Sequence, residues 1–340
     1  MKRILIIEVN WVGDVLFTTP AIRAIRENNP NAFIGCLTVP RCVDMLKDNP
    51  CIDEIIVYDE EGHHNGIFGK ISLVSELKKK RFDTVISFHR SMSRMLIAAL
   101  AGIPRRIGYS TKKRFWLLTD SVSPPSKEPH RVEYFVNIVK TIGMNTKTRD
   151  YEFYIPENAF KEADEILKEA GIEVGEKFFV INPGGNWLPK RWPKELYGEL
   201  CKGLKSEHGM KIVITGAEKD IPLAEDIISM SSNSAVSICG KTTLKELAAV
   251  MKRASVVISN DSGPMHISVS QRTPTVAIFG PTSPSITGPY GSSDYIILHK
   301  WHDCRIPCYA ECSDYRCMEA ISVDDVVEAV KKMLSKKQAP

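Results

Sequence analysis

An aspartate close to the amino terminus has the setting of a catalytic base. Asp14 ends the motif at residues 10–14, which follows an apolar run predicted to form a buried strand. Gly13 permits a tight turn after that strand, and the Thr19-Pro20 pair suits the first positions of a helix. A carboxylate at such an edge can remove the proton of a hydroxyl group, but it can also simply cap the helix. The motif alone leaves both interpretations open.

A second motif combines glycine, lysine and arginine after another predicted strand. Residues 182–193 contain Gly184-Gly185, the cations Lys190 and Arg191, and a proline directly before a predicted helix. Cationic side chains close to a helix start can hold a phosphate group, because the first backbone N–H groups of a helix are unpaired. The alternative is a basic turn exposed to water. The aromatic flanks and the position after a strand favour phosphate binding.

A third motif, residues 260–266, places an acid, a hydroxyl and a glycine before a helix that starts with proline. Its backbone amides and the helix dipole could stabilise an anionic leaving group or orient sugar hydroxyls. The alternative is a capped helix with His266 packed in its first turn. The position at the end of a strand favours a functional role.

Two further loops follow predicted strands. In residues 216–220, a carboxylate such as that of Asp220 could accept hydrogen bonds from a ribose or cap the next helix. The Gly-Lys-Thr sequence ending at Thr242 resembles the end of a Walker A loop, but Ala235 stands where that loop needs its first glycine. Residues 243–246 have the pattern of a capping box, so this loop is expected to start a helix, and its backbone could still contact a nucleobase.

Four of the nine cysteines are clustered near the carboxyl terminus, at Cys304, Cys308, Cys312 and Cys317. Their spacing lacks the two-residue gaps of common zinc sites, and disulfides are rare in the cytosol. Reduced structural thiols, a structural metal site and disulfides all remain open.

A strongly basic segment extends over residues 78–114. It holds eleven Lys and Arg against the single acid Asp83, a net charge of +10, which leaves −6 for the rest of a chain whose net charge is +4. Such runs are usually solvated faces, but this one is distributed over successive loops and helices and could line a concave basic surface for an anionic partner. The apolar residues 115–118 follow, and they suit either contact with an anionic membrane or a buried helix.

The elements that must position these motifs alternate between short apolar strands and helical periodicity, which predicts parallel sheets covered by helices, an α/β fold. Strands are expected at residues 3–9, 33–39, 54–58, 84–88, 178–182, 211–215, 255–259 and 275–279. A chain of 340 residues suggests two domains, and the pattern lapses at residues 146–156. We therefore expect domains at 1–150 and 151–340. The last helix should run from Ser322 to Leu334, and no apolar run is long enough to span a membrane.

Two classes of enzyme fit poorly. A dehydrogenase would need the fingerprint G-x-G-x-x-G after the first strand, where the chain offers only Gly13. A metal-dependent sugar transferase commonly holds its cation with Asp-x-Asp, and that triplet does not occur in the sequence. What remains is a two-domain transferase that handles a nucleotide diphosphate without an obligatory metal.

Over essentially its whole length, the chain resembles glycosyltransferase family 9, the ADP-heptose:lipopolysaccharide heptosyltransferases. The resemblance rests on Gly13-Asp14-Val15-Leu16-Phe17-Thr18-Thr19-Pro20-Ala21, on Pro183-Gly184-Gly185 with Lys190-Arg191-Trp192-Pro193, on Asn260-Asp261-Ser262-Gly263-Pro264-Met265-His266, and on Phe279-Gly280-Pro281-Thr282. The 190–193 motif and the cysteine cluster ending in Cys317-Met318 look most like the members that add the second inner-core heptose.

The resemblance implies the GT-B fold: two Rossmann-like doubly wound domains facing a central cleft, the first binding the acceptor and the second the donor. It also implies an inverting transfer that needs no metal or other cofactor, with ADP-heptose as donor. Asp14 matches the general base, and Lys190 matches the residue that binds the diphosphate and offsets charge on the departing ADP. The other matching donor positions are Gly185, Asn186, Asp220, Thr242, Asp261, Ser262, Gly263 and His266. Residues 185–186 depart from the hydroxyl residues of some relatives, so phosphate contacts there are expected from the backbone.

The implied acceptor is a heptosyl-Kdo2-lipid A core at the inner leaflet of the cytoplasmic membrane, whose phosphates and carboxylates suit the basic segment. Expected acceptor residues are Gly13, Arg90, Arg94, Arg105 and Arg106. We expect a cytoplasmic monomer, in peripheral contact with the membrane and without nucleic-acid binding. The alternatives are transfer of the first heptose to Kdo2-lipid A, or a non-catalytic module that binds a nucleotide or an anionic glycan.

Overall fold

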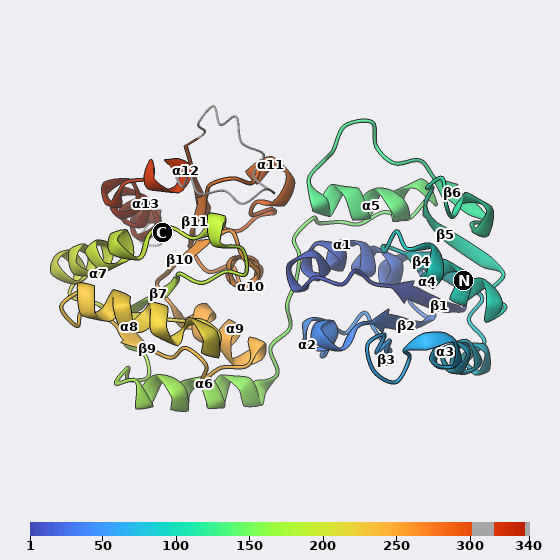
Figure 1. The fold of residues 1–340 in the computed structure, drawn as a ribbon, viewed down its shortest axis with the longest axis horizontal. Helices are drawn as coiled ribbons and strands as arrows, with labels where there is room; N and C mark the ends of the chain where they lie inside the picture. The colour runs from blue at the N-terminus through green and yellow to red at the C-terminus, as the bar shows by residue number, and fades with distance from the viewer. Residues whose placement is uncertain (301–315, 337–340) are drawn as a thin grey trace. The chain divides into compact units, whose positions relative to one another are not determined.

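The computed structural model describes residues 1–300 and 316–336 of the chain, which divides into two compact units, Met1–Tyr154 (unit 1) and Ile155–Pro340 (unit 2). The division falls inside the segment at 146–156 where the strand and helix pattern lapses. Each unit is built around a parallel sheet of its own (Figure 1).

Unit 1 contains a six-stranded sheet in the order β3-β2-β1-β4-β5-β6, with every neighbouring pair parallel. Its strands are β1 (Arg3–Ile7), β2 (Phe33–Thr38), β3 (Glu54–Val57), β4 (Thr84–Ser87), β5 (Arg105–Tyr109) and β6 (Asp120–Val122). The chain moves outward from β1 in one direction and then returns to β4 on its other side. This reversal is the topological switch of a Rossmann-like sheet.

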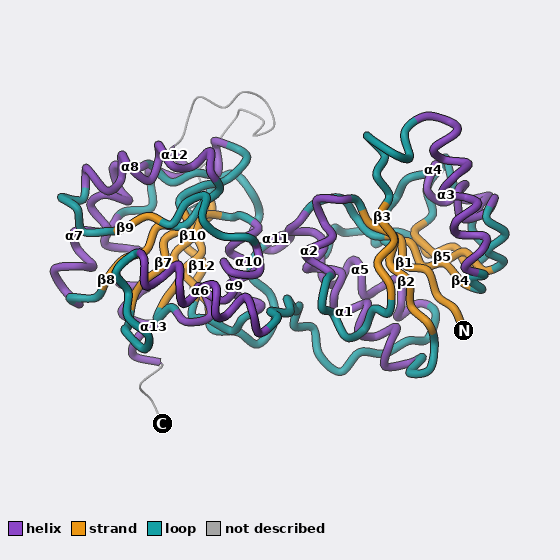
Figure 2. The backbone as a smooth tube through the Cα atoms, turned by 90° about the horizontal axis from the view of Figure 1, so that it is seen from below, coloured by secondary structure: helices purple, strands orange, loops and turns teal. Residues whose placement is uncertain are grey.

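Helices cover both faces of this sheet. They are α1 (Val12–Asn28), α2 (Val43–Leu46), α3 (Gly66–Lys80), α4 (Met92–Leu100) and α5 (Arg131–Thr141). Leu5 and Ile7 of β1 pack in one core with Leu73 and Leu77 of α3. Helices α1 and α5 pack against each other and lie side by side in Figures 1 and 2. After Arg3, β1 consists of four buried apolar residues, and because side chains alternate along a strand, it is buried on both faces of the sheet.

Unit 2 repeats the same plan with the order β12-β11-β10-β7-β8-β9. Its strands are β7 (Phe178–Asn182), β8 (Lys211–Ile214), β9 (Val236–Ser237), β10 (Val256–Asn260), β11 (Thr275–Phe279) and β12 (Tyr295–His299). Its helices are α6 (Glu157–Glu169), α7 (Lys194–His208), α8 (Ile221–Met230), α9 (Leu244–Arg253), α10 (Gly263–Ser270), α11 (Pro284–Thr287), α12 (Arg316–Glu319) and α13 (Val323–Lys336). Helices α7, α8 and α13 share the larger core on one face of the sheet, and α6 packs against α9. The switch lies between β7 and β10.

The expected α/β class and all eight expected strands are confirmed, as are the capping boxes at Thr243–Glu246 and Ser322–Asp325. The expected start of the first helix near Pro20 is wrong, because α1 begins at Val12 and Pro20 lies inside it. Proline has no N–H for the carbonyl of Leu16, and the hydroxyl of Thr19 donates to that carbonyl instead (2.8 Å). Within the described residues, no helix is long and apolar enough to cross a membrane.

Candidate functional site

The loops that leave β7 and β10 meet at the switch of unit 2, where open α/β sheets bind their ligands. Asn260, fully buried at the end of β10, ties them together. Its amide nitrogen donates to the carbonyl of Pro183 (2.8 Å), while its oxygen accepts from the backbone N–H of Trp192 (3.1 Å) and the hydroxyl of Tyr197 (2.9 Å). One buried side chain therefore fixes both ends of the glycine-rich loop at 183–192.

An ion pair lies at this switch. The ammonium of Lys190 is 2.6 Å from Oδ2 of Asp261, and the hydroxyl of Thr282 donates to the same oxygen at 2.6 Å. The carboxylate is nearly buried, with a side-chain exposure of 5%, whereas Lys190 is 24% exposed. An ammonium has three donors, so two of them remain for an anion after the bond to Asp261. The three residues come from the loops after β7, β10 and β11. These strands are parallel neighbours in the sheet, so the loops at their carboxyl ends lie close together.

A second ion pair links the neighbouring loops. Arg191 donates to the carbonyl of Gly185 (2.6 Å) and to Oδ1 of Asp220 (3.3 Å). The other oxygen of Asp220 accepts from the backbone N–H of Ala217, and a Cβ on Gly184 would lie 2.8 Å from it. The glycine is needed because the loop passes directly over this carboxylate. Asp220 therefore holds the loop in place and is itself 5% exposed.

The remaining expected donor residues lie around these pairs. Asn186 accepts from Lys219, and Gly185 has a φ of 157°, at the limit of the region that favours glycine. Ser262 immediately precedes α10, Gly263 begins that helix, and His266 is buried in its first turn with 3% exposure. Thr242 is partly buried, and its loop is joined to the Asp220 loop through the hydrogen bond from Gly240 N–H to the carbonyl of Gly216 (3.0 Å).

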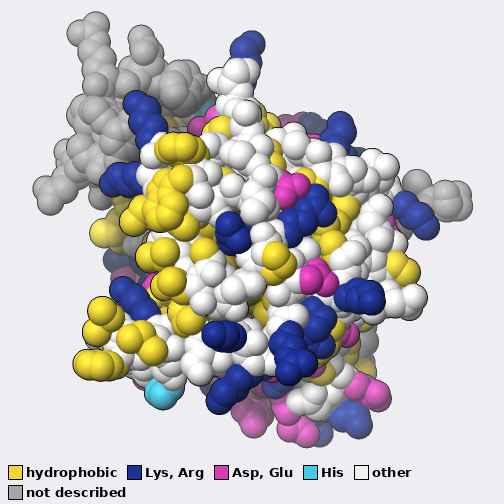
Figure 3. All heavy atoms as spheres, turned by 90° about the vertical axis from the view of Figure 1, so that its right-hand side faces the viewer, with side chains coloured by type: hydrophobic (Ala, Val, Ile, Leu, Met, Phe, Trp, Pro, Cys, Tyr) yellow, Lys and Arg dark blue, Asp and Glu magenta, His cyan; other side chains and the backbone are white. Residues whose placement is uncertain are grey.

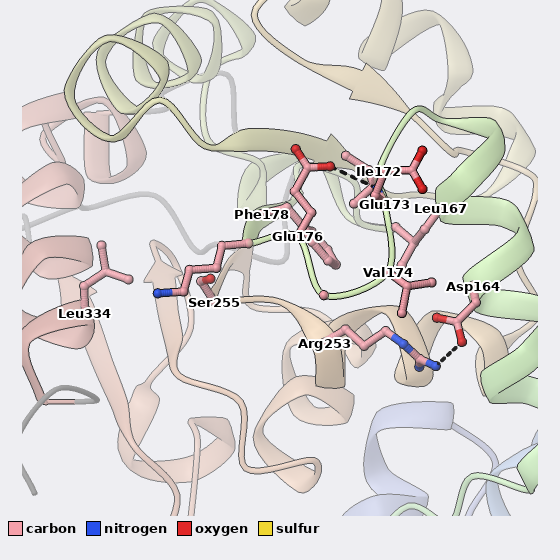
Figure 4. A pocket seen from close by; sticks show the side chains of 12 residues that line it. Asp164, Leu167, Ile172, Glu173, Val174, Glu176, Phe178, Arg253, Ser255 and Leu334 are labelled. Carbon is pink, nitrogen blue, oxygen red and sulfur yellow. Dashed lines mark hydrogen bonds and ion pairs between the residues drawn. The ribbon is translucent and has the colours of Figure 1, made fainter.

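A pocket of unit 2 lies at the opposite edge of the sheet (Figure 4). It is lined by Phe178 at the start of β7, by Ser255 just before β10, and by Asp164 and Arg253, which form an ion pair at 2.7 Å. Because the strands are parallel, this pocket is a strand's length from the carboxyl-end loops. Because ligands of open α/β sheets bind at the carboxyl ends of the strands, the candidate site is the set of loops at that edge and not this pocket.

In unit 1, Asp14 and Glu8 lie near the corresponding switch, between β1 and β4. Asp14 is in the first turn of α1 and is partly exposed. Glu8 directly follows β1 and is completely buried; it accepts from the hydroxyl of Thr18 (2.9 Å) and from the N–H of Val9 (3.1 Å). Burial raises the pKa of Glu8 to about 8, and the negative charge of Asp14 acts in the same direction. The sequence motif did not identify this second carboxyl group.

The basic segment does not form one surface, because β4 and β5 carry the chain from one edge of the sheet to the other. Arg105 and Arg106 begin β5 at the amino edge, the opposite edge from Asp14. Arg105 is paired with Asp120 (2.8 Å), and Arg106 donates to the carbonyl of Leu117 (2.6 Å). Their side chains are engaged in fastening the edge of the sheet.

At the carboxyl edge, Arg94 is buried with 2% exposure and donates to the backbone oxygen of Glu8 and to the carboxylate of Glu60. Arg90 is exposed there. Arg114 is fully buried and donates to the carbonyls of Tyr109 and His89, yet its Nη2 has no hydrogen-bond partner among the described residues.

The charges of Arg90, Arg94 and Arg114 lower the pKa values of groups in this corner. Burial, with repulsion from Arg90, lowers the pKa of Arg114 to about 10. Burial, with the charges of Arg94 and Arg114, lowers the pKa of His89 to about 4. The result is a cationic corner in which the exposed Arg90 is placed to meet an anionic group.

Of the clustered cysteines, Cys304, Cys308 and Cys312 lie outside the described residues. Cys317 is partly buried, and its sulfur would lie 3.2 Å from a Cβ placed on Gly280. The described residues contain no group of three or more His, Cys, Asp or Glu side chains arranged to hold a metal ion.

Comparison with known proteins gives one consistent family. The sequence model described as glycosyltransferase family 9 (heptosyltransferase) matches residues 70–314. The lipopolysaccharide heptosyltransferase 2 of Salmonella typhimurium is 28% identical over 87% of this chain and 87% of its own length. The lipopolysaccharide core heptosyltransferase OpsX of Haemophilus influenzae is 24% identical over 98% of this chain and 97% of its own.

Solved structures agree. The glycosyl transferase family 9 from Veillonella parvula has a TM-score of 0.88 at 27% identity, covering 98% of both chains. The E. coli ADP-heptose LPS heptosyltransferase II has a TM-score of 0.81 at 24% identity, covering 100% of both chains. With two Rossmann-like units, the GT-B fold class is confirmed. Since the family model matches more than half of the chain, the chain belongs to glycosyltransferase family 9, the heptosyltransferases, and is a glycosyltransferase.

Proposed function

We propose that the chain transfers L-glycero-D-manno-heptose from ADP-heptose to the heptosyl-Kdo2-lipid A inner core, the second heptose transfer of lipopolysaccharide core assembly. The observation that carries the proposal is the Lys190–Asp261–Thr282 cluster at the switch of unit 2, where a cation with two spare donors adjoins an oriented carboxylate. Relatives named heptosyltransferase 2 in Salmonella typhimurium and E. coli support the choice of the second transfer.

Unit 2 binds the donor in this account. Lys190 contacts the diphosphate, and Asp261, oriented by Thr282, accepts a hydrogen bond from a hydroxyl of the heptose. Asp220 contacts the ribose and the Thr242 loop contacts the nucleobase. The remaining residues, Gly185, Asn186, Ser262, Gly263 and His266, line the diphosphate and sugar. Related structures titled as complexes with ADP and with ADP-2-deoxy-2-fluoro heptose support an ADP-sugar donor.

Unit 1 binds the acceptor and supplies the base. Asp14 removes the proton from the acceptor hydroxyl, whose oxygen attacks the anomeric carbon as the bond from that carbon to the diphosphate oxygen breaks. A single displacement of this kind inverts the anomeric configuration. ADP departs with the additional negative charge, which Lys190 offsets, so no metal ion is required. Addition of a chelator is therefore expected to leave the rate unchanged.

The acceptor is anionic, and the cationic corner of unit 1 suits its phosphates and carboxylates. We assign contact with the acceptor to the exposed Arg90, with Gly13 close to the reacting hydroxyl. Arg94, Arg105 and Arg106 hold the unit together, since each already has protein partners. The enzyme works in the cytoplasm as a monomer, on an acceptor presented at the inner face of the cytoplasmic membrane.

Transfer of the first heptose to Kdo2-lipid A is the alternative reaction, and a non-catalytic binding module is the alternative class. The test is turnover with ADP-heptose and a heptose-deficient acceptor, using wild type and Asp14→Asn. The variant should lose transfer by about 10²–10⁴-fold, the usual range for a general base, while its affinity for ADP stays the same. Full activity of Asp14→Asn would remove Asp14 from the mechanism, and absence of turnover in the wild type would favour the binding module.

A further inference from the structure

Unit 1 exposes large apolar side chains where its third helix begins. Ile67, Phe68 and Ile71 of α3 are 70%, 84% and 57% exposed. Ile71 lies four residues after Ile67 and three after Phe68, so it neighbours both on one side of the helix, whereas Leu73 and Leu77 on the same helix are buried in the core.

The start of α3 is firmly held. The side chain of Asn65 caps it by accepting from the N–H of Gly66. Gly69 packs so closely on the backbone of His64 that an added Cβ would lie 2.4 Å from it. The apolar side chains are thus presented to water from an ordered turn.

Two further aromatic residues are exposed after β5. Phe115 and Trp116, in the 3-10 turn Phe115–Leu117, are 58% and 61% exposed. The turn is anchored from beneath, since Leu117 and Arg114 on either side are buried, and the indole N–H of Trp116 donates to the carbonyl of Lys113 (3.2 Å). The sequence left residues 115–118 between membrane contact and a buried helix, and the structure divides them: the aromatic pair faces water and Leu117 faces the core.

These exposed groups lie on one layer of unit 1. Leu73 of α3, Met95 of α4 and Leu117 of the turn belong to a single core cluster, so the three segments cover the same face of the sheet. Met92, 42% exposed, starts α4 between the other two segments. Figure 3 shows hydrophobic side chains gathered along one side of unit 1, with Lys and Arg side chains among and beside them. We call Ile67, Phe68, Ile71, Met92, Phe115 and Trp116 the apolar rim.

The charges within the segments that contribute the apolar rim are positive. Lys70 lies between Phe68 and Ile71, and Lys112 and Lys113 immediately precede the buried Arg114; all three lysines are exposed. Residues 62–75, 88–104 and 110–119, which contribute the rim, contain no Asp or Glu. Aromatic and aliphatic side chains mixed with cations suit the surface of an anionic bilayer, which attracts Lys and Arg electrostatically. A second copy meeting the same face about a two-fold axis would oppose cation to cation.

We propose that the apolar rim and its lysines dock unit 1 on an anionic lipid bilayer. Helices α3 and α4 both begin at the carboxyl edge of the sheet, the edge that holds Asp14, whereas the turn Phe115–Leu117 adjoins Arg106 at the amino edge. Docking would therefore lay the face of the sheet covered by α3 and α4 along the lipid head groups. This inference rests on the proposed function, because only a lipid-linked acceptor gives docking a purpose.

The test is co-sedimentation of the full chain with vesicles of phosphatidylglycerol and phosphatidylethanolamine, and with vesicles of phosphatidylcholine alone. Wild type should bind the anionic vesicles at least tenfold more tightly, and salt should weaken the binding. Two double variants should each bind the anionic vesicles at least tenfold more weakly than wild type: Phe68→Ser/Trp116→Ser and Lys112→Glu/Lys113→Glu. The matched controls are Val174→Ser, an exposed apolar residue of unit 2, and Lys78→Glu/Lys79→Glu at the other end of α3, and both should bind like wild type.

The proposal is overturned if the wild type does not sediment with anionic vesicles, or if the rim variants bind as tightly as the wild type. It is also overturned if light scattering shows a dimer that Phe68→Ser/Trp116→Ser dissociates, because the rim would then be a dimer interface. The rate of heptose transfer to an acceptor dispersed in detergent distinguishes a failure of membrane docking from a failure of the proposed function. The rim variants should keep that activity, whereas failure of the proposed function would abolish it in the wild type as well. Unchanged thermal unfolding of each variant confirms that it is folded.

Discussion

The ammonium of Lys190 lies 2.6 Å from a carboxylate oxygen of Asp261, although the two residues are 71 positions apart and belong to loops after different strands. Asp261 also accepts from Thr282 and is almost fully buried, so its position is well defined. The pair holds the lysine at the switch of unit 2 with donors to spare. It therefore prepares a cation for the diphosphate and a carboxylate for the sugar at the same point.

Lys190→Ala should weaken binding of ADP by about 10–100-fold, since a charge-assisted bond to phosphate contributes about 1.5–3 kcal/mol. The rate of transfer should fall further, because the charge on the departing ADP also increases in the transition state. Calorimetric titration with ADP and initial rates measure the two effects. Lys194→Ala is the matched control, because Lys194 pairs with the exposed Asp226. Equal ADP affinities of Lys190→Ala and wild type would contradict the assignment.

Asn260→Ala should lower the free energy of unfolding of unit 2 by about 2–4 kcal/mol. The substitution leaves the N–H of Trp192, the hydroxyl of Tyr197 and the carbonyl of Pro183 without their buried partner. Urea unfolding followed by tryptophan fluorescence measures the loss. Asn186→Ala, at an exposed position, should change stability by less than about 0.5 kcal/mol. Similar losses in the two variants would show that Asn260 does not organise the loop.

Arg90→Ala should raise the KM for the anionic acceptor with little change in ADP affinity, because Arg90 is exposed at the edge that holds Asp14. Arg105→Ala should leave this KM unchanged, since Arg105 lies at the opposite edge and is paired with Asp120. Steady-state kinetics with a fixed saturating donor concentration compares the two. A larger effect on KM from Arg105→Ala would restore the interpretation of residues 78–114 as one continuous acceptor surface.

Glu8→Gln should make stability less dependent on pH. The folded pKa of Glu8, about 8, lies above its ordinary value of 4.5, so the folded state retains a proton that the unfolded state loses between these values. Stability of the wild type therefore falls as pH rises from about 4.5 to 8, by up to about 1.4 kcal/mol per pH unit. The variant carries no such proton and should gain stability relative to the wild type over this range. Thermal melts at pH 5 to 9 that remain parallel would contradict the burial argument.

Much of this architecture could be predicted from the sequence, for physical reasons. Strands buried on both faces, such as Val256–Asn260 with its run of three apolar residues, stand out from the helices around them. β5 was missed because it begins with two arginines and contains Gly108, and β9 was missed because it has only two residues. Without β5, the basic segment could not be divided between the two edges of the sheet.

The donor motifs were recognisable because glycine, lysine and aspartate follow strand ends, and topology alone brings such loops together. Their pairing was not predictable: Lys190 contacts Asp261 and Arg191 contacts Asp220, although the two cations are adjacent in the chain. The role of Asn260 was missed because it depends on contacts with residues 68 and 77 positions away. The burial of Glu8 likewise depends on helices that the motif at residues 10–14 does not describe.

The most direct test of the central claim is analysis of the product by mass spectrometry and NMR. The enzyme is incubated with ADP-heptose and with Kdo2-lipid A acceptors that carry either no heptose or one. The account predicts that the acceptor with one heptose gains the mass of a single heptose, that its new linkage has the anomeric configuration opposite to the donor's, and that a chelator does not slow the reaction. Heptose added only to the acceptor without heptose would contradict the assignment to the second transfer, and a retained configuration would contradict direct displacement assisted by Asp14.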